Sequence, residues 1–189
     1  SREALLTLQG SQIIDNTAND ADGTGGGALY SLDSTTYINN VTMAGNLADM
    51  STGGAIMCQD CVVEAIHLNL SDNSAGDEGS GGALSMSGGQ FDLAQGTIDS
   101  NSAGSGDSIA VSEESIINIT NSIFWDNPDD FADDLDIAVS YSCGTEGIEA
   151  FSETNISVDS SPFEYAASGE RFLLQDVDVN PCLDWGDNA

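Results

Sequence analysis

The phrase Gly-Gly-Ala followed by an aliphatic residue occurs at Gly26–Leu29, Gly53–Ile56 and Gly81–Leu84, and a degenerate copy occupies Gly106–Ile109. A second phrase, an apolar residue followed three positions later by asparagine, alternates with it along the chain. Its terminal asparagines recur at intervals of 26 to 30 residues. A nearly fixed period in this range is the signature of a solenoid. These asparagines are Asn16, Asn46, Asn73, Asn101 and Asn127.

Aligning the five copies on that asparagine gives an ungapped fourteen-residue unit, from EALLTLQGSQIIDN at Glu3–Asn16 to ESIINITNSIFWDN at Glu114–Asn127. Its fourth, sixth and eleventh positions are mostly apolar, and the fifth is mostly polar. Such alternation predicts a half-buried strand. The odd spacing from the sixth to the eleventh position requires a bend between two strands. The expected inward residues are Leu6, Leu8, Ile13; Thr36, Ile38, Met43; Val63, Ala65, Leu70; Phe91, Leu93, Ile98; and Ile117, Ile119, Phe124.

The Gly-Gly-Ala phrase adds a third strand to each repeat, in which the four aliphatic residues that end the phrase stack in register. Three short strands per turn of about 27 residues predict an all-β fold, a right-handed parallel β-helix of about six coils. The repeats cover residues 1–145, and residues 146–189 are expected to form an irregular C-terminal cap of the same domain. A solenoid end needs such a cap, because its last coil otherwise exposes apolar stacks and unpaired strand edges.

Two corners of the coil are marked by sequence. The glycines are expected to turn one corner with positive φ. The asparagine column is expected to face inward at another, where stacked amides bond to one another and to the backbone. The insert between the two phrases varies most in length, which a solenoid tolerates because insertions bulge outward.

Composition limits the possible partners. The chain of 189 residues is 40% hydrophobic, holds 32 acidic residues against two arginines and no lysine, and has a formal net charge of −30. Such a surface repels nucleic acid, anionic lipid and polyuronate, which are held by Lys and Arg. It favours solubility, tolerance of salt and the binding of divalent cations. Adaptation to a saline medium accounts for the acidic composition equally well. No apolar run reaches the length of a membrane helix, so membrane insertion is not expected.

Four cysteines predict two disulfides in an oxidising compartment. Cys58 and Cys61 bracket a bend and are expected to pair locally, while Cys143 and Cys182 are expected to tie the cap to the last coils. A redox site or half of a zinc site is the alternative for Cys58-x-x-Cys61. The zinc site would need a second Cys pair or a paired His motif, and the redox site would need a βαβ context. The sequence has none of these.

The paired phrases resemble the repeats of the chlamydial polymorphic outer membrane proteins and their right-handed β-helix relatives. The family's second phrase is usually Phe-x-x-Asn, and only Phe124 keeps the phenylalanine. The C-terminal segments Ser161–Phe163, Gly169–Leu174 and Pro181–Asn188 resemble, in order, the tail of choice-of-anchor type bacterial surface proteins. The resemblance implies a secreted or surface-displayed β-helix, often adhesive or structural. It identifies no reaction.

The sequence offers few candidate catalytic residues for a polysaccharide lyase or hydrolase. A uronate lyase needs a base and a cation, but His67 falls at the predicted bend, and the arginines are Arg2 and Arg171. A hydrolase needs paired carboxylates, which Glu113, Glu114 or the aspartates between 129 and 136 offer, although a solvated acidic turn explains them as well. We therefore expect no catalytic residue, with a polysaccharide hydrolase or lyase as the alternative.

Calcium is the better candidate ligand. The segment Asn19–Gly23 alternates oxygen ligands before a glycine, as in the first half of an acidic calcium loop. The matching corner of a neighbouring coil offers further carboxylates, and a hydrated acidic edge is the alternative. The predicted metal ligands are Asn19, Asp20, Asp22, Asp77 and Glu78.

The sequence thus predicts a non-enzymatic extracellular or cell-surface module, structural or adhesive, with a glycan or host surface as a possible partner. Nothing before Leu5 covers the first coil, so Leu6, Leu8 and Ile13 are expected to form an open apolar end. Such an edge is a template for another strand layer. Further coils or another copy of the chain are expected to cover it, and head-to-tail contacts between copies would build a filament.

Overall fold

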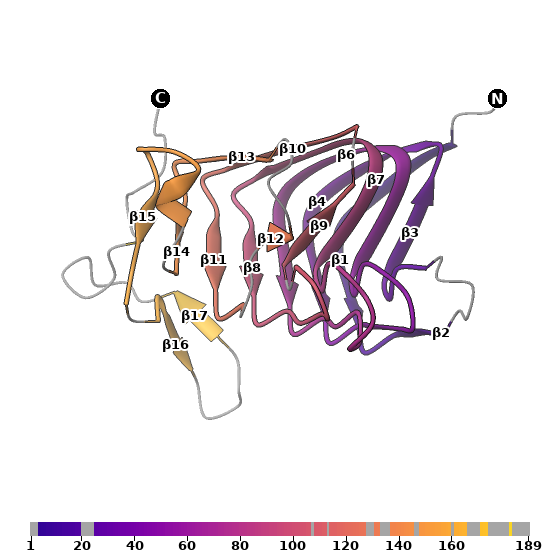
Figure 1. The fold of residues 1–189 in the computed structure, drawn as a ribbon, viewed down its shortest axis with the longest axis horizontal. Coiled ribbons are helices and arrows are strands. Elements are labelled where there is room, and N and C mark those ends of the chain that lie inside the picture. Colours follow the sequence, from indigo (N-terminus) through magenta and orange to yellow (C-terminus); the bar gives the residue numbers. More distant parts are fainter. Residues whose placement is uncertain are drawn as a thin grey trace.

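The structure is a computed structural model, and it describes residues 4–19, 25–106, 108–112, 114–127, 131–132, 137–145, 148–159, 161–165, 171–173 and 182. The chain winds into a parallel β-solenoid whose coils stack from the N-terminal to the C-terminal end (Figure 1). Each strand of a coil pairs in parallel with the equivalent strand of the next coil. The all-β parallel β-helix fold predicted from the repeats is therefore confirmed.

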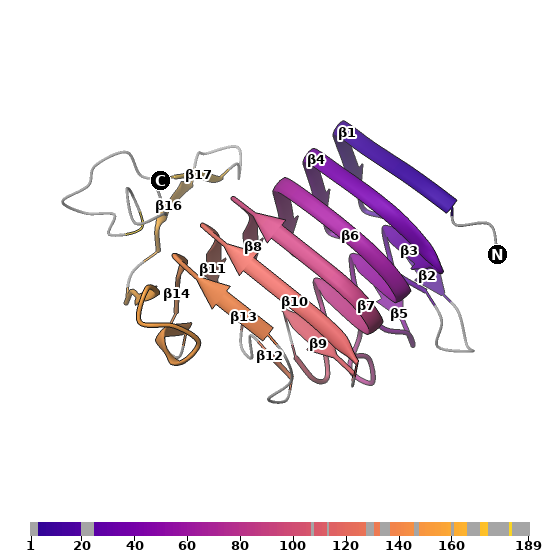
Figure 2. The same cartoon turned by 90° about the horizontal axis from the view of Figure 1, so that it is seen from above.

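The first face of the solenoid carries its longest strands, which lie side by side in Figure 2. Each long strand follows a bend and pairs with the one that lies about one repeat further along the chain. In order along the stack, these strands are β1 (Ala4–Ile14), β4 (Ser34–Ala44), β6 (Ile56–Ser71), β7 (Leu84–Ala94), β10 (Ser115–Thr120) and β13 (Ile137–Ser140).

The other two faces use shorter segments. The second face follows the bend within each unit, and there the ends of β1, β4 and β6 are continued by β8 (Thr97–Asp99), β11 (Ile123–Trp125), β14 (Cys143–Gly144) and β15 (Ile156–Ser157). The third face begins with the Gly-Gly-Ala phrase and comprises β3 (Leu29–Leu32), the starts of β6 and β7, β9 (Ile109–Val111) and β12 (Phe131–Ala132). The pair β2 (Thr17–Asn19) and β5 (Leu47–Asp49) lies just beyond the asparagine corner.

The core consists of the aliphatic columns that the repeat predicts. Ile38, Phe91 and Leu70 are at most 2% exposed, and the equivalent positions of neighbouring coils are in register beside them. Thr36, the one polar residue expected inside, is also fully buried, and its hydroxyl lies 3.3 Å from that of Ser31. The columns are less buried at the N-terminal end of the stack, where Leu8 and Ile13 are half-buried and Leu6 is 37% exposed.

The bends between strands are built from columns of left-handed residues. The predicted bend in the middle of each unit has positive φ in every described coil, from Gly10 (55°) to Tyr141 (50°), and the residue before each corner asparagine also has positive φ. Only the glycines do this without steric cost, but Asn, Asp and other polar residues tolerate it in turns. The mid-unit column is Gly10, Asn40, His67, Gln95, Asn121 and Tyr141.

The Gly-Gly-Ala corner needs its two glycines for different reasons. Gly53 and Gly81 have φ of 70° and 68°, as expected for a glycine that turns the corner. The second glycine, Gly54, has no positive φ, but a β-carbon there would collide with the carbonyl oxygen of Gly82 in the next coil. The second glycine is therefore required by close backbone approach between coils.

The asparagine column forms a buried ladder of amides, as predicted. The Oδ1 of Asn73 accepts hydrogen bonds from both the backbone N–H and the Nδ2 of Asn46, at 3.0 and 2.9 Å. The Nδ2 of Asn73 in turn donates to the carbonyl oxygen of Met43 and to Oδ1 of Asn101, both at 3.0 Å. Asn46, Asn73 and Asn101 are at most 1% exposed. Each amide thus satisfies its own polar atoms while joining three coils.

The C-terminal end differs from the repeats. The sixth coil contributes β13 and β14 but has no third-face strand in the described part of the chain, so there are fewer complete coils than the predicted six. A 3-10 helix η1 (Ile148–Ala150) leads to β15, which pairs with β14, and an antiparallel hairpin of β16 (Phe163–Tyr165) and β17 (Arg171–Leu173) follows. In the described ranges, no helix is long and apolar enough to cross a membrane.

Both predicted disulfides are present: Cys58 bonds to Cys61 and Cys143 bonds to Cys182. The first spans the bend at Asp60, where β6 passes from the third face to the first, and both of its cysteines are buried. The second links β14 to a residue 39 positions later. Two disulfides indicate folding in an oxidising compartment.

Replacing Cys143 and Cys182 together by serine is expected to lower the free energy of unfolding by about 2–4 kcal/mol, because the bridge restricts a long loop in the unfolded chain. Replacing Cys58 and Cys61 by serine should lower the free energy of unfolding less. The disulfide between them closes a loop with a sequence separation of only three residues. Chemical denaturation of both variants, with non-reducing peptide mapping of the wild-type chain, checks this. An equal effect of the two pairs would contradict it.

Candidate functional site

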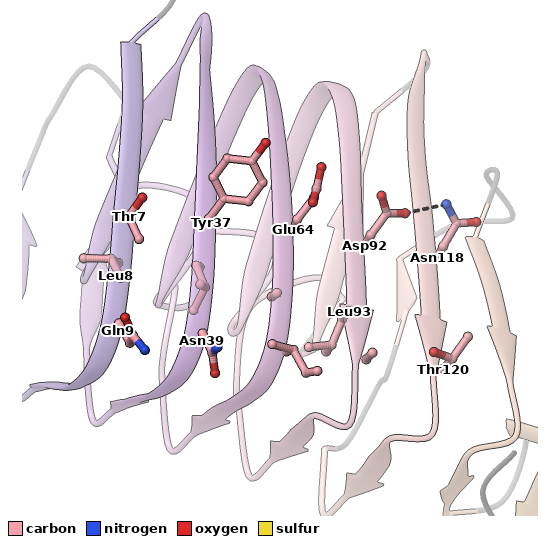
Figure 3. Close-up of a pocket in the computed structure, with 14 residues that line it drawn as sticks. Thr7, Leu8, Gln9, Tyr37, Asn39, Glu64, Asp92, Leu93, Asn118 and Thr120 are labelled. Carbon is pink, nitrogen blue, oxygen red and sulfur yellow. Dashed lines mark hydrogen bonds between the residues drawn. The ribbon is translucent and has the colours of Figure 1, made fainter. Parts of the chain in front are cut away.

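A groove with a volume of about 630 Å3 runs across the outer surface of the first face (Figure 3). It crosses β1, β4, β6, β7 and β10, and therefore draws residues from five successive coils. This volume lies within the range of about 300–1,000 Å3 that is usual for ligand-binding pockets. The lining residues are Thr7, Leu8, Gln9, Tyr37, Ile38, Asn39, Glu64, Ala65, Ile66, Asp92, Leu93, Ala94, Asn118 and Thr120.

Strand alternation places two rows of outward side chains in this groove, on either side of the inward column that contains Ile38. Parallel pairing in register aligns each row across the strands. Figure 3 shows the labelled members of the rows following one another from coil to coil. The upper row is Thr7, Tyr37, Glu64, Asp92 and Asn118, and the lower row is Gln9, Asn39, Ile66, Ala94 and Thr120.

Asp92 is held in place by two amides. Its Oδ2 accepts a hydrogen bond of 2.6 Å from Nε2 of Gln90, and its Oδ1 accepts one of 2.7 Å from Nδ2 of Asn118 in the next coil. Glu64 occupies the neighbouring position of the same row, directly beside Asp92 in the pairing of β6 with β7. The two carboxylates therefore extend from backbone positions about 4.8 Å apart. Glu64 is exposed to solvent, whereas Asp92 is half-buried.

The groove also offers apolar surface to solvent. Tyr37 is 42% exposed and Ile66 is 38% exposed, and they come from the adjacent strands β4 and β6. An exposed aromatic ring beside hydrogen-bonding groups is a common element of binding surfaces, because it provides contact area at a small loss of conformational freedom. No Lys, Arg or His is among the lining residues, so the charge of the groove comes from Glu64 and Asp92 alone.

The predicted metal site is only partly within the described ranges. Asn19 is exposed at the end of β2, where it pairs with Asp49 of β5, and Asp77 and Glu78 lie exposed on a turn one coil beyond that aspartate. The coil of β5 thus separates Asn19 from the turn. Asp20 and Asp22 lie outside the described residues. Among the residues that the structure does describe, no group of three His, Cys, Asp or Glu side chains could hold a metal ion.

Of the other candidate catalytic residues, the structure describes His67 and Glu114, and neither lines the groove. His67 lies at the exposed mid-unit bend with a φ of 53°, where the repeat places a polar turn residue. Glu114 lies at the bend before β10, also with positive φ. Glu113 and the aspartates at 129, 130, 133, 134 and 136 lie outside the described residues.

The outward position of the upper row is predictable from the sequence, but the groove is not. A single unit shows only that the fifth position points outward. Whether five such positions line a hollow or a flat wall depends on how the coils curve and on the lengths of their side chains. The available signal is the run of Tyr, Glu, Asp and Asn at one outward position in consecutive coils. Solvent exposure alone does not account for the aromatic residue in that run.

No family model, curated protein or solved structure matches this chain.

Proposed function

We propose that this protein is a non-enzymatic extracellular module that binds a ligand in the groove of its first face, and so acts as an adhesive surface. The observation that carries this proposal is the groove itself. It presents two registered rows of mostly polar side chains and an exposed Tyr37, which lies on β4, a strand that is paired on both sides. Binding residues on a rigid scaffold lose little conformational freedom when a ligand arrives.

The extracellular part of the proposal is supported by the two disulfides, which persist in oxidising environments. The net charge of −30 favours a highly soluble protein that does not associate with nucleic acid or anionic membranes. The resemblance of the repeats to those of surface β-helix proteins supports the same location. An adhesive role also fits a solenoid, because stacked coils present an extended surface.

The proposal is tested by measuring binding and turnover on the same material. Immobilised protein is presented to arrays of glycans and extracellular matrix proteins, and any bound ligand is then incubated with the protein and analysed for cleavage products. Saturable binding that is lost on mutation of the groove, without release of products, is the expected result. Cleavage of the ligand, or binding that no groove substitution weakens, would refute it.

A second candidate, a polysaccharide hydrolase or lyase, is favoured by one observation: Glu64 and Asp92 are neighbours in the groove. Paired carboxylates about 5–9.5 Å apart are the catalytic groups of glycoside hydrolases. The enzyme hypothesis requires that Glu64→Gln and Asp92→Asn each abolish product release. Asp92 also accepts hydrogen bonds from the side-chain amides of Gln90 and Asn118. It therefore has a structural role, the orientation of these neighbours, that does not depend on catalysis.

We also propose that calcium binds at the loop that begins at Asn19, with Asp20 and Asp22 as ligands and Asp77 and Glu78 from a later coil as further candidates. The expected result is a melting temperature that rises with calcium, corresponding to about 2.7 kcal/mol at a hundredfold excess over the dissociation constant. Thermal melts in chelator, millimolar calcium and millimolar magnesium measure it. Identical melts in chelator and calcium would exclude the site.

The N-terminal edge of the stack is proposed to be covered by another subunit. In the described ranges β1 pairs with β4 alone, and Leu5 and Leu6 are 69% and 37% exposed. Contact through this edge joins unlike surfaces of two copies and can propagate into a filament. Sedimentation over a range of concentrations should therefore detect species heavier than the 19.5 kDa chain. A single 19.5 kDa species at all concentrations would contradict it.

A further inference from the structure

We propose that the ligand of the groove is an uncharged polysaccharide chain that lies across the strands, with one sugar ring stacked on Tyr37. This inference rests on the proposed binding function and specifies the chemistry of its ligand. It follows from four properties of the groove: its charge, its balance of hydrogen-bond donors and acceptors, its exposed apolar surface, and the pairing of its strands.

Charge excludes acidic ligands. Two carboxylates line the groove without any cation among the lining residues, and the whole chain carries only two arginines against 32 acidic residues. A polyuronate or sulfated chain would bring further negative charge next to Glu64 and Asp92, with no guanidinium or ammonium to compensate for it. An uncharged ligand avoids this repulsion.

The polar groups of the groove match hydroxyl groups, which both donate and accept hydrogen bonds. The amides of Gln9 and Asn39 and the hydroxyls of Thr7 and Thr120 can act as donors or acceptors, and Glu64 is an acceptor. A ligand that only donates, such as a protonated polyamine, would leave the amide N–H groups without acceptors. A ligand rich in hydroxyls can satisfy both kinds of group along the length of the groove.

The two exposed apolar side chains favour a ligand with apolar faces as well as polar edges. Tyr37 and Ile66 lie on adjacent strands and in different rows, so they are diagonal neighbours on the groove surface. A sugar ring presents hydroxyls at its rim and C–H groups on its faces, so one ring can cover the Tyr37 ring while its rim reaches Thr7 or Glu64. Rigid, exposed aromatic rings of this kind act as anchors in binding sites.

Strand pairing argues against a peptide that binds by β-augmentation. β4 lies between β1 and β6, β6 between β4 and β7, and β7 between β6 and β10. A peptide that adds to a sheet needs an unpaired strand edge. In the described ranges, β1 at the end of the stack is the one groove strand with such an edge, and a peptide added there would extend the sheet beyond the groove. The ligand must therefore be recognised by side chains, which repeat from coil to coil at about 4.8 Å. A linear polymer laid across the strands meets one row member from each coil.

The experiment is native gel electrophoresis of the full chain in gels that contain a soluble polysaccharide. The polymers are uncharged β-glucan, galactomannan and arabinoxylan, an acidic polygalacturonate, and a cationic chitosan. Retardation by at least one uncharged polymer, and none by polygalacturonate, is expected. Tyr37→Ala should weaken that retardation by roughly tenfold in apparent affinity. Tyr30→Ala is the matched control, because Tyr30 is 40% exposed on the third face, away from the groove.

Circular dichroism and melting temperature establish that both tyrosine variants are folded. Retardation by chitosan alone would overturn the inference, because the net charge of −30 attracts a polycation without any contribution from the groove. Equal retardation of the two variants, or no retardation by any uncharged polymer, would overturn it as well. These outcomes are separate from a failure of the proposed function. A chain that binds a protein ligand through the groove keeps the adhesive function and loses this inference, whereas cleavage of a retained uncharged polymer keeps the ligand class and refutes the non-enzymatic function.

Discussion

Replacing Asn101 by alanine is expected to lower the free energy of unfolding by about 3–5 kcal/mol. The fully buried amide takes part in four hydrogen bonds. Its Oδ1 accepts from the N–H and Nδ2 of Asn73, and its Nδ2 donates to the carbonyl oxygen of Leu70 and to Oδ1 of Asn127. Truncation removes a partner from buried polar groups of Asn73 and Leu70 in the preceding coil and of Asn127 in the following coil. Leaving one such group unsatisfied costs about 1–3 kcal/mol.

The measurement is urea unfolding followed by circular dichroism, with Asn39→Ala as the control. Asn39 is also an asparagine of the repeat region, but it is exposed on the outer surface of β4. Its loss should change stability by no more than about 0.5 kcal/mol. If the two variants unfold at the same urea concentration, the amide ladder does not stabilise the stack.

Replacing Ile117 by alanine is expected to destabilise the protein by about 3–5 kcal/mol, in the upper part of the range for truncating a buried isoleucine. Ile117 is fully buried in β10, where it lies in register between Phe91 and Ile137 of the neighbouring coils. A solenoid core is only a few side chains wide, so the coils on both sides of the cavity lose contacts.

Ile116 provides an unusually close control. It precedes Ile117 in the same strand, has the same side chain, and is 47% exposed on the opposite surface. Ile116→Ala should change the free energy of unfolding by no more than about 0.5 kcal/mol. The difference between the two losses in the free energy of unfolding therefore reports which of the two residues points into the core. Equal losses would mean that β10 is not paired in the register described here.

Sequence periodicity was sufficient to predict the fold, because every coil repeats the same pattern of buried residues, bends and corner residues. Polar–apolar alternation determined which side of each strand is buried, and the odd spacing before Ile13 and its equivalents determined the bend that the structure shows at Gly10 and the other mid-unit residues. The asparagine column was predictable because a buried amide at a corner needs partners, and the next coil offers them.

The sequence could not predict the groove, because a hollow is a property of several coils together. Two-residue alternation places Tyr37 and Glu64 outside, but it does not determine whether the row is concave. The positions of the bends were predicted better than the residue types that form them. Aspartates such as Asp15 and Asp33 also adopt positive φ, although left-handed residues were expected only among the glycines of the Gly-Gly-Ala corner. Local side-chain hydrogen bonds let Asp and Asn occupy this region. The insert that contains Asp20 follows no repeat in the sequence, so periodicity makes no prediction about the positions of its residues.

The amide ladder also gives the solenoid a direction. At every step, the Nδ2 and the backbone N–H of one asparagine donate to the Oδ1 of the asparagine in the following coil, from Asn16 through to Asn127. The amide dipoles therefore add along the axis instead of cancelling, and the two ends of the stack are chemically different. Any coil that is placed before β1 must present N–H donors to Asn16 for the series to continue. Growth of the stack is thus vectorial, and a second copy turned end for end would bring acceptor against acceptor at this corner.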